Sequence, residues 1–288
     1  MERVTVDVAG LRFSALAEGP EDGPLALCLH GFPDSAQTWR HLLPALGAAG
    51  YRAVAPWMRG YAPTGPAPDG RYELARLGED ANGLHAALGA DGRAVLIGHD
   101  WGASAVYHAL LAEPERWSRA VAIAVPPTVG GIDLSCEPQM RRSWYSFLLQ
   151  LPVAEEAVMR EDLRLIRRLW EDWSPGYDHA EDFLHVREAL ADPACLLAAI
   201  TYYRHNATSV VGPEAAAANR EVLAGLATPL LYLHGANDGC VGLDLLDEPT
   251  VAYPPGTTVE IVPDAGNFLQ LERPDETARL VLGFLGGA

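Results

Sequence analysis

Short apolar runs separated by polar turns dominate the first 125 residues, and each run is typical of a β-strand. They cover Val4–Val8, Leu11–Leu16, Leu25–Leu29, Tyr51–Ala55 and Ala120–Val125. The turn Ala9-Gly10 between the first two runs predicts a hairpin. A helical spacing of leucines over Leu74–Leu88 separates later runs. Because strands and helices alternate, we predict a mostly parallel sheet that is covered by helices on both faces.

The alternation stops near Gly130, and the next eighty or so residues are predicted to be all-helical. The expected helices are Arg141–Leu151, Glu155–Trp170, Glu181–Leu190 and Ala194–Asn206. The strand pattern then resumes at Pro229–His234 and Thr258–Val262, before a last helix at Pro274–Leu285. We therefore expect an α/β core formed by residues 1–130 and 213–288, interrupted by a helical cap over residues 131–212.

Composition narrows the possible functions. The chain has 288 residues, of which 49% are hydrophobic, and this suits a globular protein with a large core. A net charge of −17 argues against binding to nucleic acid or to an anionic membrane surface. No apolar stretch is long enough to span a membrane and the N-terminal segment lacks an apolar signal core, so we expect a cytoplasmic protein. Nothing in the pattern sets an oligomeric state.

The four cysteines are scattered and form no C-x-x-C pair, so neither a disulfide framework nor a zinc site is predicted. They are Cys28, Cys136, Cys195 and Cys240. The chain also lacks a G-x-G-x-x-G or P-loop pattern. We therefore expect no metal, nucleotide or organic cofactor, and a small molecule as the partner.

The most informative motif is Gly98-His99-Asp100-Trp101-Gly102, which joins an apolar strand-like run to a helix-like stretch. This is the layout of a nucleophile elbow, G-x-nucleophile-x-G, with aspartate where serine is usual. Glycines are needed because side chains at Gly98 or Gly102 would collide with the neighbouring strand or helix. A carboxylate held on such a turn can attack an electrophilic alkyl carbon and form an ester. The simpler alternative, that Asp100 only caps the helix, does not account for the glycines.

Two further segments fit an active site around Asp100. His30-Gly31-Phe32-Pro33 follows the third predicted strand, where the backbone N–H of Phe32 and that of Trp101 can form an oxyanion hole. Asp238 follows the strand that resumes the sheet, where a triad in the order nucleophile, acid, base places its acid. Each segment alone is also compatible with an ordinary turn.

The base should follow in the loop before the last helix, but that loop carries Asn267 in Gly266-Asn267-Phe268. An amide does not accept a proton near neutral pH, so Asn267 cannot be a general base. The nine histidines lie elsewhere, and none is a clear substitute.

Taken in order, these motifs resemble the α/β-hydrolase fold, and within it the branch of epoxide hydrolases and haloalkane dehalogenases. The resemblance covers nearly the whole chain. It implies that Asp100 attacks carbon to give an ester, which a histidine-activated water would then hydrolyse. It also implies two cap tyrosines that bind and protonate an epoxide oxygen. Segments Trp144-Tyr145-Ser146-Phe147 and Tyr202-Tyr203-Arg204-His205-Asn206 match those of the family, which maps the pair to Tyr145 and Tyr203.

We therefore predict an epoxide hydrolase scaffold that is inactive or limited to one turnover because Asn267 replaces histidine. A haloalkane dehalogenase is the first alternative, although Phe32 stands where such enzymes typically carry asparagine. The second is a catalytically silent binding protein that uses the fold as a receptor. In the third, histidine was deliberately replaced so that the ester accumulates.

Overall fold

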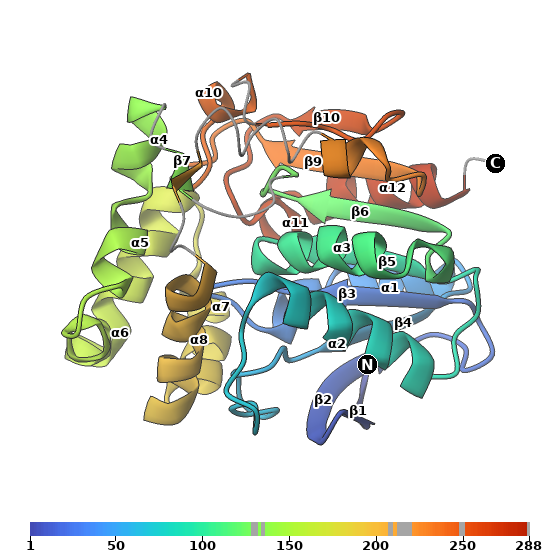
Figure 1. Cartoon of the computed structure of the whole chain (residues 1–288), viewed down its shortest axis with the longest axis horizontal. Coiled ribbons are helices and arrows are strands. Elements are labelled where there is room, and N and C mark those ends of the chain that lie inside the picture. The colour runs from blue at the N-terminus through green and yellow to red at the C-terminus, as the bar shows by residue number, and fades with distance from the viewer. Residues whose placement is uncertain (128–131, 134–135, 207–209, 212–220, 248–250, 287–288) are drawn as a thin grey trace.

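The computed structural model describes residues 1–127, 132–133, 136–206, 210–211, 221–247 and 251–286. An eight-stranded sheet with the order β1-β2-β4-β3-β5-β6-β9-β10 runs through the molecule (Figure 1). β1 (Glu2–Val8) and β2 (Leu11–Glu18) form the predicted hairpin, and β2 pairs antiparallel with β4 (Arg52–Pro56). The other pairs are parallel, and their strands are β3 (Leu25–Leu29), β5 (Val95–His99), β6 (Arg119–Ile123), β9 (Leu230–Gly235) and β10 (Thr258–Val262).

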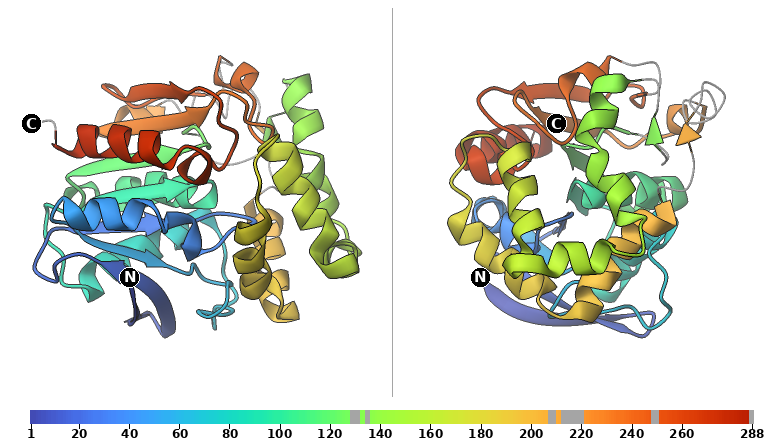
Figure 2. Two further views of the ribbon diagram at one scale, coloured as in Figure 1. Left: turned by 180° about the vertical axis from the view of Figure 1, so that it is seen from behind. Right: turned by 90° about the vertical axis from the view of Figure 1, so that its left-hand side faces the viewer.

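Helices cover both faces of the sheet, as the alternating pattern predicts. α2 (Leu74–Ala87) and α3 (Trp101–Ala112) lie on the face seen in Figure 1. α1 (Leu42–Ala48) and α12 (Pro274–Gly286) lie on the opposite face (Figure 2).

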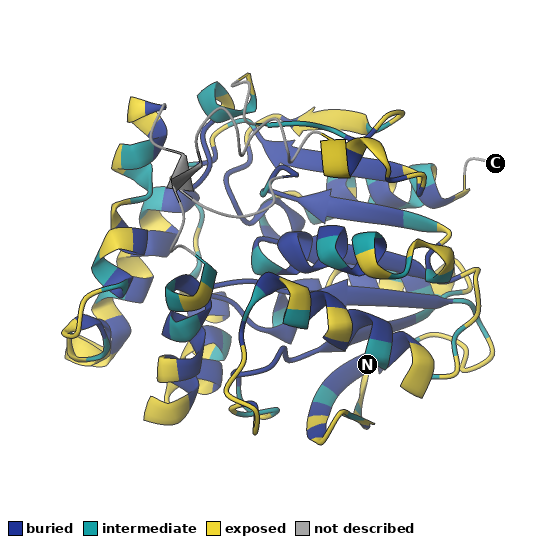
Figure 3. Cartoon of the chain, in the orientation of Figure 1, coloured by how far each residue is buried: buried dark blue, intermediate teal, exposed yellow. Residues whose placement is uncertain are grey.

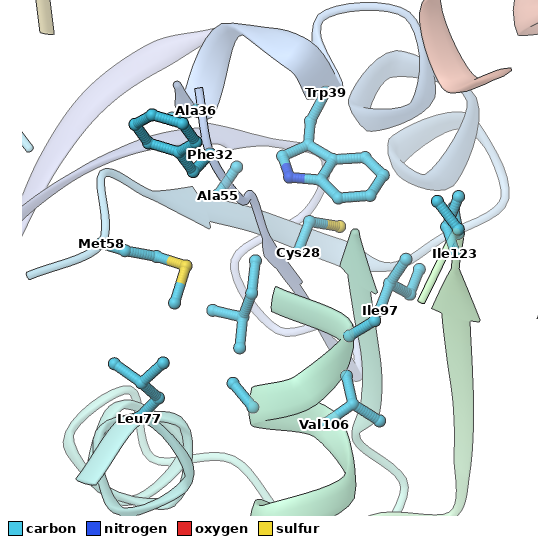
Figure 4. Close-up of a cluster of buried hydrophobic side chains, with 14 of the residues drawn as sticks. Cys28, Phe32, Ala36, Trp39, Ala55, Met58, Leu77, Ile97, Val106 and Ile123 are labelled. Carbon is cyan, nitrogen blue, oxygen red and sulfur yellow. The ribbon is translucent and has the colours of Figure 1, made fainter. Parts of the chain in front are cut away.

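The main hydrophobic core lies between these layers. β3, β5 and β9 are buried at every position, which explains their continuous apolar runs (Figure 3). Figure 4 shows Cys28 and Ile97 of the sheet between Val106 of α3 on one side and Trp39 on the other. All four side chains are fully buried. The core therefore fixes the ends of the central strands, from which the candidate site is built.

The helical cap is inserted between β6 and β9 and stands at one end of the sheet (Figure 1). Its helices are α4 (Glu137–Arg142), α5 (Trp144–Leu149), α6 (Ala154–Trp173), α7 (Ala180–Leu190) and α8 (Pro193–Asn206). Short parallel strands β7 (Ile132–Asp133) and β8 (Val210–Val211) pair with each other where the insertion begins and ends. The predicted cap boundaries at residues 130–131 and 212–213 lie outside the described residues.

Two helix predictions need correction, and one helix was missed. The continuous helix Arg141–Leu151 is instead α4 and α5, divided at Ser143, whose hydroxyl accepts a hydrogen bond from the Gln139 amide over 3.0 Å. The helix expected over Glu155–Trp170 is interrupted, because residues 160–163 have non-helical dihedral angles. α1 was not predicted, since proline and glycine within its seven residues obscure the helical period.

Two short helices follow the candidate site residues of the second core part. α10 (Leu243–Leu246) comes after Asp238, and α11 (Leu269–Glu272) comes after Asn267. Over the ranges given above, no helix is both long and apolar enough to cross a membrane. Over the same ranges, no three His, Cys, Asp or Glu side chains are arranged to hold a metal ion.

Candidate active site

Asp100 lies on a strained turn between β5 and α3. Its φ of 54° is in the left-handed region, which non-glycine residues adopt only when surrounding structure enforces it. A Cβ on Gly98 would lie 2.2 Å from the Gly102 carbonyl oxygen, and one on Gly102 would lie 2.1 Å from that of Leu29. Neighbouring backbone atoms therefore leave no room for a side chain at either glycine, as the sequence predicts. The turn has the geometry of a nucleophile elbow.

Backbone N–H groups surround the Asp100 carboxylate. Phe32 N donates to Asp100 Oδ1 over 2.7 Å. A Cβ on Gly31 would lie 2.3 Å from the same oxygen, so only glycine allows the loop to approach this closely. Burial raises the pKa of Asp100 to about 7, although the N–H groups of Phe32 and Trp101 act in the opposite direction. The two predicted oxyanion-hole residues thus lie together at the carboxylate.

Asp238 lies on the loop after β9 and is enclosed by donors. Its Oδ1 accepts from the backbone N–H groups of Cys240 at 2.7 Å and Val241 at 3.0 Å. Its Oδ2 accepts from Asn267 Nδ2 at 3.1 Å. Burial nevertheless raises the pKa of Asp238 to about 8, because all of these donors are neutral. The acid and Asn267 are therefore in direct contact, as their order along the chain predicts.

Asn267 also accepts a hydrogen bond from His99, the residue before the nucleophile. His99 Nε2 lies 3.0 Å from the Asn267 carbonyl oxygen and 3.1 Å from Asn267 Oδ1. Because both neighbours are acceptors, Nε2 must carry the proton. Burial lowers the pKa of His99 to about 4, so the ring is neutral. Asn267 consequently connects His99 to Asp238 through both ends of its amide.

Tyr145 and Tyr203 project from two different cap helices and meet edge to face, with ring centroids 5.6 Å apart. Tyr203 also contacts Trp101 at 5.0 Å and Phe32 at 5.2 Å, so it lies directly over the elbow. Burial raises the pKa of both phenols well above the usual value of 10, and the charge of Asp100 adds to the effect on each. Both side chains are therefore protonated and within electrostatic reach of Asp100.

Cys240 belongs to this group, although the sequence pattern gave it no role. Its Sγ lies 3.3 Å from the Tyr145 hydroxyl, within hydrogen-bonding distance. Burial, reinforced by the charges of Asp238 and Asp100, raises the pKa of the thiol well above its usual value. The thiol is thus unreactive, and its position two residues after Asp238 was the only signal in the sequence.

Comparison with known proteins identifies the family to which the chain is similar. A profile of the alpha/beta hydrolase fold matches residues 24–274. The AB hydrolase superfamily protein YfhM of Bacillus subtilis is 30% identical, covering 97% of this chain and 96% of that protein. Epoxide hydrolase A of Mycobacterium tuberculosis is 28% identical, covering 98% and 96%.

Solved structures agree with the sequence relatives. The crystal structure of epoxide hydrolase A from Mycobacterium thermoresistibile has a TM-score of 0.79 at 27% identity, covering 99% of this chain and 98% of that one. The epoxide hydrolase CorEH shares the fold with a TM-score of 0.84, covering 99% and 98%, at 20% identity. The chain belongs to the α/β hydrolase fold family, in the branch that contains the epoxide hydrolases.

Proposed function

We propose that this chain opens epoxides by nucleophilic attack of Asp100. The observation that carries the proposal is a carboxylate on a strained elbow, held by the Phe32 N–H at 2.7 Å, with two protonated phenols within electrostatic reach of it. Attack forms a C–O bond from Asp100 to one epoxide carbon and breaks the bond from that carbon to the ring oxygen. The developing alkoxide takes its proton from Tyr145 or Tyr203. The product is an alkyl–enzyme ester that carries a new hydroxyl group.

Hydrolysis of that ester is the step that we expect to fail. Water must lose a proton as it attacks the ester carbonyl, and the base should lie beside Asp238. Asn267 stands there instead, with Nδ2 committed to Asp238 and Oδ1 to His99. His99 is not a ready substitute, because burial lowers its pKa to about 4 and so makes its unprotonated Nδ1 a weak base. The proposed activity is therefore a single turnover that ends at the ester.

Alkyl halides are a second class of electrophile with which the site is compatible. Trp101 Nε1 is buried and forms no hydrogen bond of good geometry among the described residues, although its N–H is close enough to Tyr203 to oppose the rise in the pKa of that phenol. A ring N–H of this kind is the donor type with which the dehalogenase branch holds a departing halide. Attack of Asp100 on an alkyl halide would give the corresponding ester and release halide without a proton from either tyrosine.

Intact-protein mass spectrometry after incubation with a panel of epoxides and alkyl halides tests the proposal. An epoxide adds its full mass to the protein, whereas an alkyl halide adds its mass less that of the hydrogen halide. We expect one epoxide adduct, absent in Asp100→Ala and retained in Asp91→Ala, which removes an exposed surface carboxylate. An adduct of unchanged yield in Asp100→Ala would refute the nucleophile. Adducts from alkyl halides alone would favour the dehalogenase, and none from any compound would favour a silent binding protein.

A further inference from the structure

Gln139 of α4 joins the cap to the loop that carries Asp238. Its Nε2 donates to the Cys240 carbonyl oxygen at 2.8 Å, and its Oε1 accepts from the Gly242 N–H at 3.0 Å. One side-chain amide therefore satisfies two backbone groups that lie two residues apart. Gln139 is only 7% exposed, so water does not readily replace it if the contact is lost.

Asn206 makes the same contact at the other side of the cap. Its Nδ2 donates to the Tyr72 carbonyl oxygen at 2.8 Å, and its Oδ1 accepts from the Leu74 N–H at 2.9 Å. These backbone groups are also two residues apart, at the start of α2. Two amides thus hold two different core segments by the same pair of hydrogen bonds.

Each amide is close to one of the two cap tyrosines. Asn206 follows Tyr203 by three residues, about one turn, on α8. Gln139 hydrogen bonds to Ser143 at the junction of α4 and α5, and Tyr145 is the second residue of α5. The Tyr145 hydroxyl in turn lies 3.3 Å from Cys240 Sγ, on the same loop that Gln139 holds. A shift of either amide side chain would therefore be expected to shift the tyrosine next to it along the chain.

We propose that Gln139 and Asn206 are positioning residues, and that each fixes one tyrosine over Asp100 by clamping its cap helix to the core. The inference rests on the proposed ring opening of epoxides, because it assigns the two amides to the two proton donors of that step. It predicts that each amide acts more strongly on its own tyrosine than on the other, which it reaches through the ring contact between Tyr145 and Tyr203. Loss of the Gln139 contact displaces Tyr145, and loss of the Asn206 contact displaces Tyr203.

The kinetic test is a set of double-mutant cycles on the rate of Asp100 alkylation. Gln139→Leu and Asn206→Leu remove the amides at similar size, and Tyr145→Phe and Tyr203→Phe remove the hydroxyls. A misplacement of about 1 Å can cost roughly 10²-fold, so we expect each leucine variant alone to slow alkylation about 10-fold or more. Within a matched pair, such as Gln139 with Tyr145, the second change should add less than about two-fold. Crossed pairs, such as Gln139 with Tyr203, should come closer to multiplying, because their coupling passes only through the contact between α5 and α8.

Asp244→Asn is the matched control. It weakens a partly exposed ion pair with Arg142, which also joins α4 to the core, and it leaves the contacts of Gln139 in place. We expect it to leave the alkylation rate within about two-fold, as is typical of surface pairs. If a leucine variant slows alkylation equally in the Tyr145→Phe and Tyr203→Phe proteins, the amides only stabilise the cap. If it slows alkylation in neither protein, the placement of the tyrosines does not depend on the amides. Either result overturns the proposal.

Amide hydrogen exchange separates this inference from the function on which it rests. Gln139→Leu should accelerate exchange at the Gly242 N–H and not at the Leu74 N–H, and Asn206→Leu should do the reverse. If no epoxide alkylates the wild-type chain, the proposed function fails, while this exchange pattern still supports two separate clamps. Equal acceleration at both sites in either variant, or at neither site, contradicts them whatever the reactivity.

Discussion

The substitution Asn267→His places an imidazole between Asp238 and the ester that Asp100 is proposed to form. Asn267 Nδ2 already donates to Asp238 Oδ2 at 3.1 Å, and an imidazole Nδ1–H can take over that bond. His99 loses Asn267 Oδ1 as an acceptor but keeps the backbone carbonyl oxygen at 3.0 Å. The change therefore removes about one hydrogen bond, worth roughly 0.5–1.5 kcal/mol, from a network that otherwise stays in place.

We expect this change to restore repeated turnover. A general base typically contributes about 10²–10⁴-fold, or roughly 3–5 kcal/mol of transition-state stabilisation. The imidazolium formed during the reaction lies beside Asp238, and its charge lowers the raised pKa of that carboxyl. Neutral imidazole is the active form of the base. The restored turnover should therefore rise with pH through the pKa of the new histidine and then level off.

The assay is diol formed per mole of protein, measured for both forms on one epoxide that has been shown to alkylate Asp100. Asn267→Gln is the matched control, since it changes the side chain and keeps an amide that cannot act as a base. Many turnovers by the Asn267 form would refute the reasoning and make His99 the first candidate for the base. Continued single turnover in the histidine form would mean that the site is disabled elsewhere, which would favour the binding-protein alternative.

Three further outcomes follow from the geometry. Only the ionised carboxylate attacks, and the pKa of Asp100 is raised to about 7, so the alkylation rate should rise with pH through about 7 and then plateau; a flat profile from about pH 5 to 9 would contradict this. Gly31→Ala sets a Cβ 2.3 Å from Asp100 Oδ1 and should slow alkylation by about 10²-fold. Gly283→Ala in α12 is the control, because its new Cβ has no atom within 4 Å; it should leave the alkylation rate unchanged and slightly raise Tm. Asp100→Asn should gain stability over the wild type as pH rises, because the native carboxyl keeps its proton up to about 7 while the unfolded chain loses it near the usual 3.8; a Tm difference that stays constant with pH would refute the raised pKa.

The fold was largely predictable because its signals are local. Continuous apolar runs marked the buried parallel strands, and the end of the alternation marked the cap, and both are confirmed. The errors fall where local signals conflict with tertiary structure. Pro44 and Gly47 concealed α1, and the Gln139–Ser143 contact divides a stretch that reads as one helix. The domain boundaries remain a prediction.

The candidate site was predictable from the order of motifs in its core half, whereas in the cap only Tyr145 and Tyr203 were predicted, and those from the family resemblance. The carboxyl ends of parallel strands meet at one edge of a sheet, so motifs that follow β3, β5 and β9 had to converge. That is why Phe32, Asp100 and Asp238 lie together, although their roles remain predictions. Gln139 and Cys240 act through contacts between the cap and the core, and no spacing along the chain encodes such contacts.

Asn267 is well accommodated, and this bears on how the chain is best understood. Its Oδ1 accepts from His99 and its Nδ2 donates to Asp238, so the amide satisfies both neighbours of the position where a base is expected. It is fully buried, and neither of its side-chain polar atoms is left without a partner. The loop therefore does not need a histidine to keep its shape. The groups that the first step requires, namely the elbow carboxylate, its N–H donors and the two phenols, stay in place around it. In the proposed mechanism this single side chain decides whether the reaction ends at an ester or continues to a diol, and its exchange for histidine tests that one step without disturbing the other.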